Sequence, residues 1–386
     1  MQHWMRNVGV TTAIGLGLLL SSAWSINPSA QKKPAPKAAS KDAAGVPRYE
    51  WDPTWPKQPF PDAWETGGGM GVAVDAKDHI WFLHRAKDLS AFEAAAGAVP
   101  PRAICCKPAP AVIEFDQAGT VVSSWGGPGP GYEWPSSEHG LTIDHKGNFW
   151  IGASEGKDAQ ILKFTRDGKF LLQIGKSGQS KGNSDTANLK GAADTAVDPA
   201  TNEVWVADGY GNRRVIVYDA DTGAYKRHFG AYGNKPEDGP AQRYTPNAGM
   251  PMPTQFALVH CVKFSNDGLV YVCDRVHDRI QVFRKDGTFV KEKIVTPDVV
   301  GAVANDIAFS PDKEQRFMYV TDHSSSKVWI LKREDMSVVG SFGYGGHFGG
   351  GFTIVHNIAA DSKGNLYVTE GLEGKRVQRF LYKGLK

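Results

Sequence analysis

Six copies of one strand pattern recur along the chain, and no other feature restricts its fold as strongly. Each copy begins with an apolar strand that ends in Asp or Ser, continues through a tight turn, and enters a second strand rich in β-branched and aromatic residues. The turns contain Gly or Asn, which hairpins need where φ is positive. The six first strands end at Asp75, Asp144, Asp198, Ser265, Ser310 and Asp361.

A single four-stranded unit of this kind cannot bury both of its faces. Packing six units radially buries the faces and protects the strand edges. The repeat therefore predicts an all-β chain, a six-bladed β-propeller with four-stranded antiparallel blades over residues 48–386. We expect the last blade to take a strand from residues 48–60 to close the ring. The alternative, a β-solenoid, would have shorter and more uniform repeats.

The N-terminus has the pattern of an export signal. Arg6 precedes an apolar run over residues 8–20, and small residues follow up to Ser25. This run is short for a membrane span and is typical of a signal peptide over residues 1–25. Residues 26–47 are rich in Ala, Lys and Pro and are interpreted as a disordered linker. The prediction is an exported protein, periplasmic or secreted, and the alternative is an uncleaved N-terminal anchor.

Charge and cysteine content restrict the partners. The net charge is +3 without a concentrated basic patch, which argues against nucleic acid. We expect no membrane span after signal cleavage and a monomeric protein. In an exported chain Cys261 and Cys273, which flank one turn, are either a disulfide or two small buried hydrophobic residues. Nothing in the sequence decides the state of Cys105 and Cys106.

Histidine recurs at one position of the repeat in every second unit. Five residues before the strand end, the six units carry Met70, His139, Ala193, His260, Asn305 and His356. Alternate blades of a six-fold ring lie 120° apart, and the first strands of a propeller line its channel. The pattern therefore predicts that His139, His260 and His356 bind one metal ion with an open position, as catalytic Zn²⁺ sites do. Imidazole also suits Cu, Fe and Ni, and a channel histidine can simply be a hydrogen-bonded core residue.

The next position of the repeat suggests a second ion. Backbone carbonyls of Val72 and Leu141, together with the Asn357 side chain, would offer oxygen ligands to Ca²⁺. The alternative is that Asn357, Asp194 and Asp306 cap turns at the channel mouth.

Residues directly after the second strands should lie near the histidines, because antiparallel strands bring these ends to one side of a blade. Arg85 and Arg275 would receive a substrate carboxylate. Tyr210 would act as a general base if a metal lowered its pKa. The alternative is that Tyr210 only packs and that the arginines form salt bridges with Asp208 or Asp274.

Several of these motifs resemble the peptidyl-α-hydroxyglycine α-amidating lyase (peptidylamidoglycolate lyase) family. The resemblance covers roughly residues 65–384, with all motifs in order. It implies a six-bladed propeller of the NHL-repeat type. The motifs are Gly71-Val-Ala-Val-Asp75, Phe82-Leu-His-Arg85, His139-Gly-Leu-Thr-Ile-Asp144, Ala207-Asp-Gly-Tyr-Gly-Asn-Arg213, Val259-His260 and Val355-His356.

The resemblance also implies roles for individual residues. By similarity, His139, His260 and His356 are zinc ligands, and the carbonyls of Val72 and Leu141 are ligands of a structural calcium. Tyr210 corresponds to the catalytic tyrosine, Arg85 to an active-site arginine and Arg275 to a second arginine near the site. The implied products are a peptide amide and glyoxylate.

Three positions depart from the family pattern. Asn357 stands where the family has an aspartate calcium ligand, so one negative charge is missing. Ile354 replaces a methionine beside the zinc, and Gly211 replaces a cysteine of a family disulfide.

Three functions are compatible with these observations. The first is a zinc-dependent lyase acting on a small peptide-like or hydroxyglycine-type substrate. The second is a non-catalytic NHL-repeat propeller that binds a peptide or protein across its face. The third is a propeller lactonase, which the three-histidine column disfavours because such enzymes use carboxylate and asparagine ligands for calcium.

Overall fold

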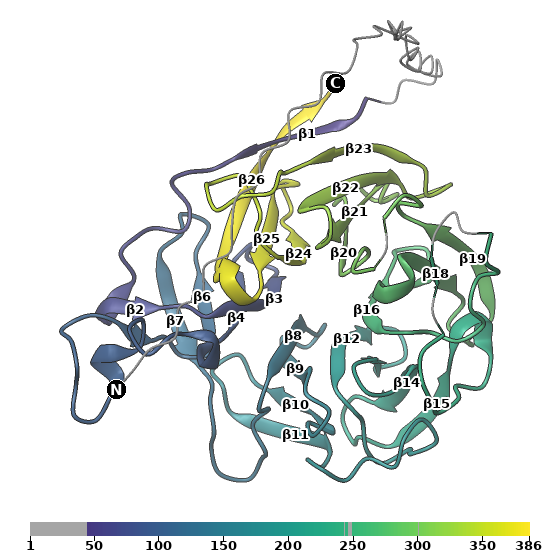
Figure 1. Cartoon of the computed structure of the whole chain (residues 1–386), viewed down its shortest axis with the longest axis horizontal. Coiled ribbons are helices and arrows are strands. Elements are labelled where there is room, and N and C mark those ends of the chain that lie inside the picture. Colours follow the sequence, from purple (N-terminus) through teal and green to yellow (C-terminus); the bar gives the residue numbers. More distant parts are fainter. Residues whose placement is uncertain (1–44, 243, 246–248, 300) are drawn as a thin grey trace, which may run out of the picture. The chain divides into compact units, whose positions relative to one another are not determined.

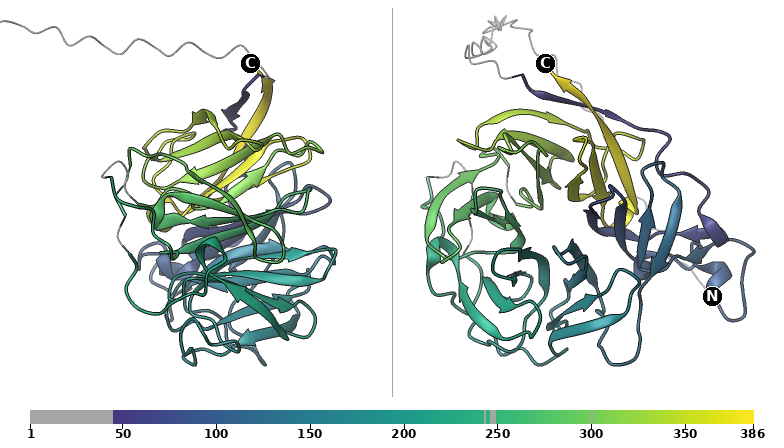
Figure 2. Two further views of the ribbon diagram at one scale, coloured as in Figure 1. Left: turned by 90° about the vertical axis from the view of Figure 1, so that its right-hand side faces the viewer. Right: turned by 180° about the vertical axis from the view of Figure 1, so that it is seen from behind.

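Six four-stranded antiparallel sheets are arranged as a ring around a common axis (Figure 1). The computed structural model describes residues 45–242, 244–245, 249–299 and 301–386, and within these ranges the only helices are short 3₁₀ turns. This confirms the six-bladed all-β propeller. The view from behind shows the same ring, and the side view shows it edge-on (Figure 2).

Each blade runs from an inner strand to an outer strand in sequence order, except in the last blade. The first three blades consist of β3 (Gly68–Val74), β4 (Ile80–Arg85), β6 (Val112–Phe115) and β7 (Val121–Trp125); β8 (Glu138–Ile143), β9 (Phe149–Ala153), β10 (Gln160–Phe164) and β11 (Phe170–Gly175); and β12 (Ala192–Asp198), β13 (Glu203–Asp208), β14 (Arg214–Asp219) and β15 (Tyr225–Phe229).

The other three blades consist of β16 (Val259–Phe264), β17 (Val270–Asp274), β18 (Arg279–Phe283) and β19 (Phe289–Ile294); β20 (Ile307–Phe309), β21 (Phe317–Asp322), β22 (Lys327–Lys332) and β23 (Val338–Phe342); and β24 (Val355–Ala360), β25 (Leu366–Glu370), β26 (Arg376–Leu385) and β1 (Pro47–Trp51). A small parallel pair joins β2 (Trp64–Glu65) to β5 (Lys107–Pro108). The 3₁₀ turns are η1 (Pro61–Ala63), η2 (Ala86–Asp88), η3 (Ala95–Gly97), η4 (Ala231–Gly233), η5 (Arg275–His277) and η6 (Leu372–Gly374).

The ring is closed by strand β1, which is the outer strand of the sixth blade. It pairs antiparallel with β26, with Tyr49 opposite Tyr382 and Trp51 opposite Phe380. A closing strand was expected within residues 48–60, and the strand begins one residue earlier, at the end of the predicted linker. The predicted signal peptide and the linker up to residue 44 lie outside the described residues.

Aspartates at the ends of the first strands hold the turns that follow. Asp144 Oδ1 accepts hydrogen bonds from the backbone N–H groups of Lys146 (2.9 Å) and Asn148 (2.8 Å). Its Oδ2 accepts another from Trp150 Nε1 (3.2 Å), a side chain of the second strand. The same arrangement surrounds Asp75 in the first blade. In these two blades the aspartate therefore ties the turn to the strand that follows it.

Replacing Asp144 with alanine is expected to lower the free energy of unfolding by about 1–3 kcal/mol, because the buried Trp150 Nε1–H and two partly buried backbone N–H groups lose their acceptor. Urea denaturation measures this loss. Asp167→Ala is the matched control, since Asp167 lies in an exposed turn of the same blade, and it should change the stability little. Equal losses in the two variants would contradict this role of Asp144.

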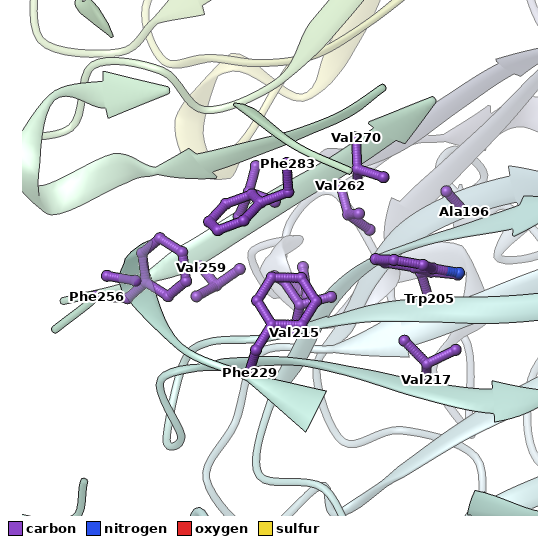
Figure 3. Close-up of a cluster of buried hydrophobic side chains, with 14 residues drawn as sticks. Ala196, Trp205, Val215, Val217, Phe229, Phe256, Val259, Val262, Val270 and Phe283 are labelled. Atoms are coloured by element: carbon purple, nitrogen blue, oxygen red, sulfur yellow. The ribbon is translucent and has the colours of Figure 1, made fainter. Parts of the chain in front are cut away.

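The hydrophobic core lies between neighbouring blades rather than along the axis. Figure 3 shows one such cluster, in which Trp205, Val217 and Phe229 of the third blade pack against Val262 and Phe283 of the fourth. Comparable clusters of buried apolar residues lie between the other blades. Each blade therefore stabilises the next. The positions near the axis are not needed for this core and can carry polar side chains.

Cys261 and Cys273 form a disulfide across β16 and β17, with their Cα atoms 4.9 Å apart. The disulfide is therefore the correct one of the two alternatives. The adjacent residues Cys105 and Cys106, in the loop after β4, are also paired with each other. Among the described residues, none of the helices has the length and apolar character that a membrane span requires.

Candidate metal centre and active site

The three predicted histidines meet at the axis of the ring. His139 lies on β8, His260 on β16 and His356 on β24, the inner strands of alternate blades. All three are buried, and their ring centroids are separated by 4.7–5.1 Å. One ligand nitrogen from each lies within 4.8 Å of the other two. The two-blade spacing read from the sequence therefore corresponds to one cluster in space.

The second ring nitrogen of each histidine donates a hydrogen bond and so determines the tautomer. His139 Nδ1 donates to the Ala193 carbonyl and His260 Nδ1 to the Asn305 carbonyl, both at 2.7 Å. A carbonyl oxygen only accepts, so the proton must be on Nδ1 and the Nε2 lone pair is free. His356 Nδ1 in turn donates to Asn357 Oδ1 at 2.5 Å. All three histidines therefore direct an unprotonated Nε2 toward the axis.

Three free lone pairs at such close range repel one another, and a cation would relieve this repulsion. His139 Nε2 and His356 Nε2 are 3.1 Å apart, close to the roughly 3.3 Å that two imidazole nitrogens of a tetrahedral Zn²⁺ site would show. Burial lowers the pKa of His356 to about 3 and holds the pKa values of His139 and His260 well below the usual histidine value. Because the imidazoles stay neutral near pH 7, this donor set fits a divalent metal ion.

Tyr210 lies directly beside the histidine cluster. Its hydroxyl is 3.0 Å from His139 Nε2 and 3.1 Å from His260 Nε2, and it accepts a longer hydrogen bond from Arg275 Nη1 (3.4 Å). Burial raises the pKa of Tyr210, while the positive charges of Arg275 and Arg85 act in the opposite direction. The hydroxyl is therefore placed to exchange a proton with a group held at the cluster.

The loop after β13 positions Tyr210 through its backbone. The Tyr210 N–H donates to the Gly191 carbonyl (3.0 Å), and the Lys190 N–H donates to Asp208 Oδ1 (2.8 Å). Gly191 has a φ of +70°, and a side chain there would lie 2.6 Å from Tyr210 Cβ. Glycine is therefore needed at position 191 for the ring of Tyr210 to reach the axis.

Arg85, the last residue of β4, is buried at the same end of the channel. Its Nη2 donates to the Glu138 carbonyl and to Ser154 Oγ, both at 3.0 Å. Its Nε is buried and has no hydrogen-bond partner among the described residues. The guanidinium is thus held in place on one side and keeps a free donor for an anion.

Arg275 approaches the site from the start of η5. Its guanidinium lies 5.8 Å from the centre of the Tyr210 ring, and its Nε is also buried without a partner among the described residues. Two guanidinium groups therefore flank one tyrosine at the mouth of the histidine cluster. This is a suitable environment for a small molecule with a carboxylate.

The alternative salt bridges are made by other arginines. Asp208 pairs with Arg214 (2.8 Å) and Asp274 pairs with Arg279 (3.0 Å), and all four side chains are fully buried. The nearest carboxylate to Arg85 is Asp88, at 3.9 Å. Arg85 and Arg275 are therefore not needed to neutralise the acidic residues that end the second strands.

The donors suggested for calcium lie nearby but make other contacts. Val72 and Leu141 line a cavity of about 450 Å³ in the channel, and they stand later in the inner strands than the histidines do. Asn357 Oδ1, the proposed side-chain ligand, accepts the hydrogen bond from His356 instead. The alternative was that Asp194 and Asp306 cap turns. In the structure both pair with Lys263, a residue that the sequence reasoning missed.

A second group of potential ligands, on the first blade, is explained without a metal. Asp75, His79 and Glu114 lie close together. Arg166 of the second blade pairs with both carboxylates, and His79 Nδ1 is 2.7 Å from Glu114. The arginine supplies the positive charge, so this group links two blades.

Sequence comparisons bear on the same site. Over 237 residues, 60% of this chain, it is 27% identical to peptidyl-glycine alpha-amidating monooxygenase B of Xenopus laevis. Over 230 residues, 57% of this chain, it is 25% identical to a probable peptidyl-alpha-hydroxyglycine alpha-amidating lyase of Caenorhabditis elegans. The chain's homologues include the α-amidating lyases. These matches cover 24% of the frog protein and 56% of the nematode protein, so the similarity to each α-amidating relative is partial.

One structural comparison concerns the fold. A streptogramin B lyase structure matches 88% of this chain and 98% of its own, with a TM-score of 0.51 and 12% sequence identity. At that identity the similarity supports the propeller alone. No family model matches the chain.

Proposed function

We propose that the chain is a zinc-dependent lyase that cleaves a peptidyl-α-hydroxyglycine, or a similar carbinolamide, into an amide and glyoxylate. One observation carries this proposal: three unprotonated imidazole nitrogens lie together beside the Tyr210 hydroxyl. The hydroxyl oxygen is 3.0 Å from His139 Nε2 and 3.1 Å from His260 Nε2. The α-amidating homologues support the same reaction class.

The reaction requires one proton transfer and no redox change. In R–CO–NH–CH(OH)–COO⁻ the C–N bond breaks, the carbinol C–O bond becomes the carbonyl of glyoxylate, and the hydroxyl proton ends on the amide nitrogen. No water is consumed. The protein therefore has to bind the carboxylate, remove a proton from oxygen and return it to nitrogen.

Arg85 and Arg275 would bind the substrate carboxylate through their free Nε–H groups. Ser154 and the Glu138 carbonyl hold Arg85 in a fixed orientation, so little side-chain entropy is lost on binding. The substrate's hydroxyl-bearing carbon would then face the histidine cluster. Both arginines also favour negative charge on the Tyr210 oxygen.

Tyr210 would act as the general base through its phenolate oxygen. It would accept the proton of the substrate hydroxyl and return it to the departing amide nitrogen. His139, His260 and His356 would hold the zinc through Nε2, with Nδ1 fixed by Ala193, Asn305 and Asn357. When bound, zinc would supply Lewis acidity toward the substrate hydroxyl oxygen.

We also propose that the protein is exported. A disulfide between Cys261 and Cys273 is stable in oxidising compartments. It supports the interpretation of residues 1–25 as a signal peptide.

The proposed function is tested by glyoxylate release from α-hydroxyhippurate. N-(hydroxymethyl)benzamide is the matched compound, because it has the same carbinolamide but no carboxylate and would release formaldehyde. We expect zinc-dependent turnover of α-hydroxyhippurate, and a kcat/KM for the second compound lower by about 100-fold, since charge-assisted hydrogen bonds from two arginines are lost.

Two results would contradict the proposal. Fully metallated protein without turnover of either compound would favour a peptide-binding propeller. Equal turnover of both compounds would retain the lyase chemistry but remove the carboxylate-binding role of Arg85 and Arg275.

A further inference from the structure

A lysine on an inner strand joins three neighbouring blades in the channel. Lys263, on β16 of the fourth blade, places its Nζ 2.8 Å from Asp194 Oδ2 of the third blade and 3.0 Å from Asp306 Oδ1 of the fifth. Both carboxylates are only 2% exposed. The Lys263 side chain also lines the channel cavity that Val72 and Leu141 line. One ammonium group therefore pairs with two buried carboxylates at the axis.

The repeat makes room for this side chain. Two residues before the strand end, the column of Lys263 contains Ala73, Thr142, Ala196, Ala308 and Ala359 in the other five units. These residues are all small. A single long side chain can therefore cross the channel at this level, toward aspartates that come from the two blades flanking its own.

The hydrogen bonds continue from Lys263 to a metal-binding histidine. Asp306 Oδ2 accepts from Asn357 Nδ2 (3.1 Å), and Asn357 Oδ1 accepts from His356 Nδ1 (2.5 Å). The backbone N–H of Ile358 also donates to Asp306 Oδ2 (3.1 Å). Because the Asn357 amide nitrogen donates to Asp306, the amide oxygen faces His356. The orientation of Asn357 is therefore set by a carboxylate that pairs with Lys263.

A divalent cation fits this donor set poorly. Ca²⁺ takes six to eight oxygen ligands and favours carboxylates. Here the side-chain oxygen of Asn357 is engaged by a proton of His356, and the two nearest carboxylates are engaged by an ammonium group of the chain itself. The Lys263 ammonium already occupies the position between the two carboxylates, so a second cation would have to displace it.

We infer that the Lys263 ammonium is a built-in replacement for a structural divalent cation in this channel, and that it positions His356 through Asp306 and Asn357. The first half of the inference, that Lys263 replaces a divalent cation, is independent of the proposed lyase function. The second half, that Lys263 positions His356, rests on that function. Lys263 is accordingly a positioning residue and not a catalytic one.

The test compares the parent with Lys263→Met, using Ca²⁺ alone as the probe in titration calorimetry and thermal denaturation. The parent should bind no Ca²⁺, and its Tm should be the same in calcium-free buffer and in Ca²⁺. Lys263→Met leaves two carboxylates without their ammonium partner, so its Tm should fall in calcium-free buffer and recover in Ca²⁺ with one ion bound per chain. Lys285→Met is the matched control, because Lys285 also pairs with a buried aspartate (Asp198, 2.8 Å), and it should not respond to Ca²⁺.

Zinc affinity tests the second half. In calcium-free buffer without a chelator, Lys263→Met should bind zinc at the histidines about tenfold more weakly, as changes behind metal-ligating histidines typically do, and Ca²⁺ should restore the parent value. If no variant binds zinc while the calcium results hold, the proposed function fails and the first half of this inference stands.

Stoichiometric calcium in the parent, or a Lys263→Met variant whose Tm ignores Ca²⁺, would overturn the inference. Should Lys263→Met not fold without Ca²⁺, the double variant Lys263→Met/Asn357→Asp, produced in Ca²⁺, provides a third carboxylate. It should fold and bind calcium more tightly than Lys263→Met produced in the same way. Failure of the double variant to bind calcium would count against the inference equally.

Discussion

Replacing His260 with alanine should remove the bound zinc and, with it, glyoxylate formation. The two remaining imidazoles, His139 and His356, would have to hold the ion alone. Altering residues behind metal ligands already costs roughly 10- to 100-fold in affinity, so we expect losing a ligand to cost at least about 100-fold. Metal content of the purified variant and its turnover of α-hydroxyhippurate should fall together.

The control for this variant is His145→Ala. His145 is exposed in the turn after β8, outside the channel, so its removal should leave metal content and turnover at the parent level. A His260→Ala protein with a full complement of tightly bound zinc would show that the three-histidine cluster is not the metal site. A folded variant is recognised by an unchanged far-ultraviolet circular dichroism spectrum.

Replacing Tyr210 with phenylalanine should lower kcat by about 10²- to 10⁴-fold, the usual contribution of a general base, with KM and zinc content little changed. The phenyl ring keeps the packing beside Gly191, and only the oxygen between His139 and His260 is lost. Steady-state kinetics with α-hydroxyhippurate measures both constants.

Tyr225→Phe is the appropriate comparison, because Tyr225 is an exposed tyrosine of an outer strand. It should behave like the parent in kcat and KM. If Tyr210→Phe raised KM while kcat was retained, Tyr210 would be a binding residue and another group would have to move the proton. If Tyr210→Phe lost zinc, the hydroxyl would be needed for metal affinity.

The fold and the meeting point of the histidines could be predicted because both follow from periodicity. Six units in one ring place alternate units 120° apart, so one column of the repeat was enough to bring His139, His260 and His356 together. The position of Arg85 beside this column followed from antiparallel geometry in the same way. Periodicity predicts which blade a residue belongs to and how far along the channel axis it lies.

Periodicity does not predict the contacts of individual side chains, and the expectations for Asn357 and Lys263 show this. Asn357 was assigned to calcium by its position in the repeat, but its amide oxygen faces His356 because its amide nitrogen donates to Asp306. The sequence did contain a signal for Lys263, which is the only long side chain in a column of small residues. The two neighbouring blades each carry an aspartate two positions earlier in the repeat. The meaning of this signal depends on the reach of a lysine to both neighbouring blades, which a linear pattern does not measure.

The pairing of β1 with β26 has a kinetic consequence. These are the first and last strands of the propeller along the chain, so their contact closes the longest loop in the fold and carries a large entropic cost. Contacts between such distant segments slow folding. Until β1 docks, β26 presents an edge of unpaired backbone groups, which can recruit a neighbouring molecule. Refolding yield should therefore fall as protein concentration rises, with exchange of residues 47–51 between copies as the competing reaction.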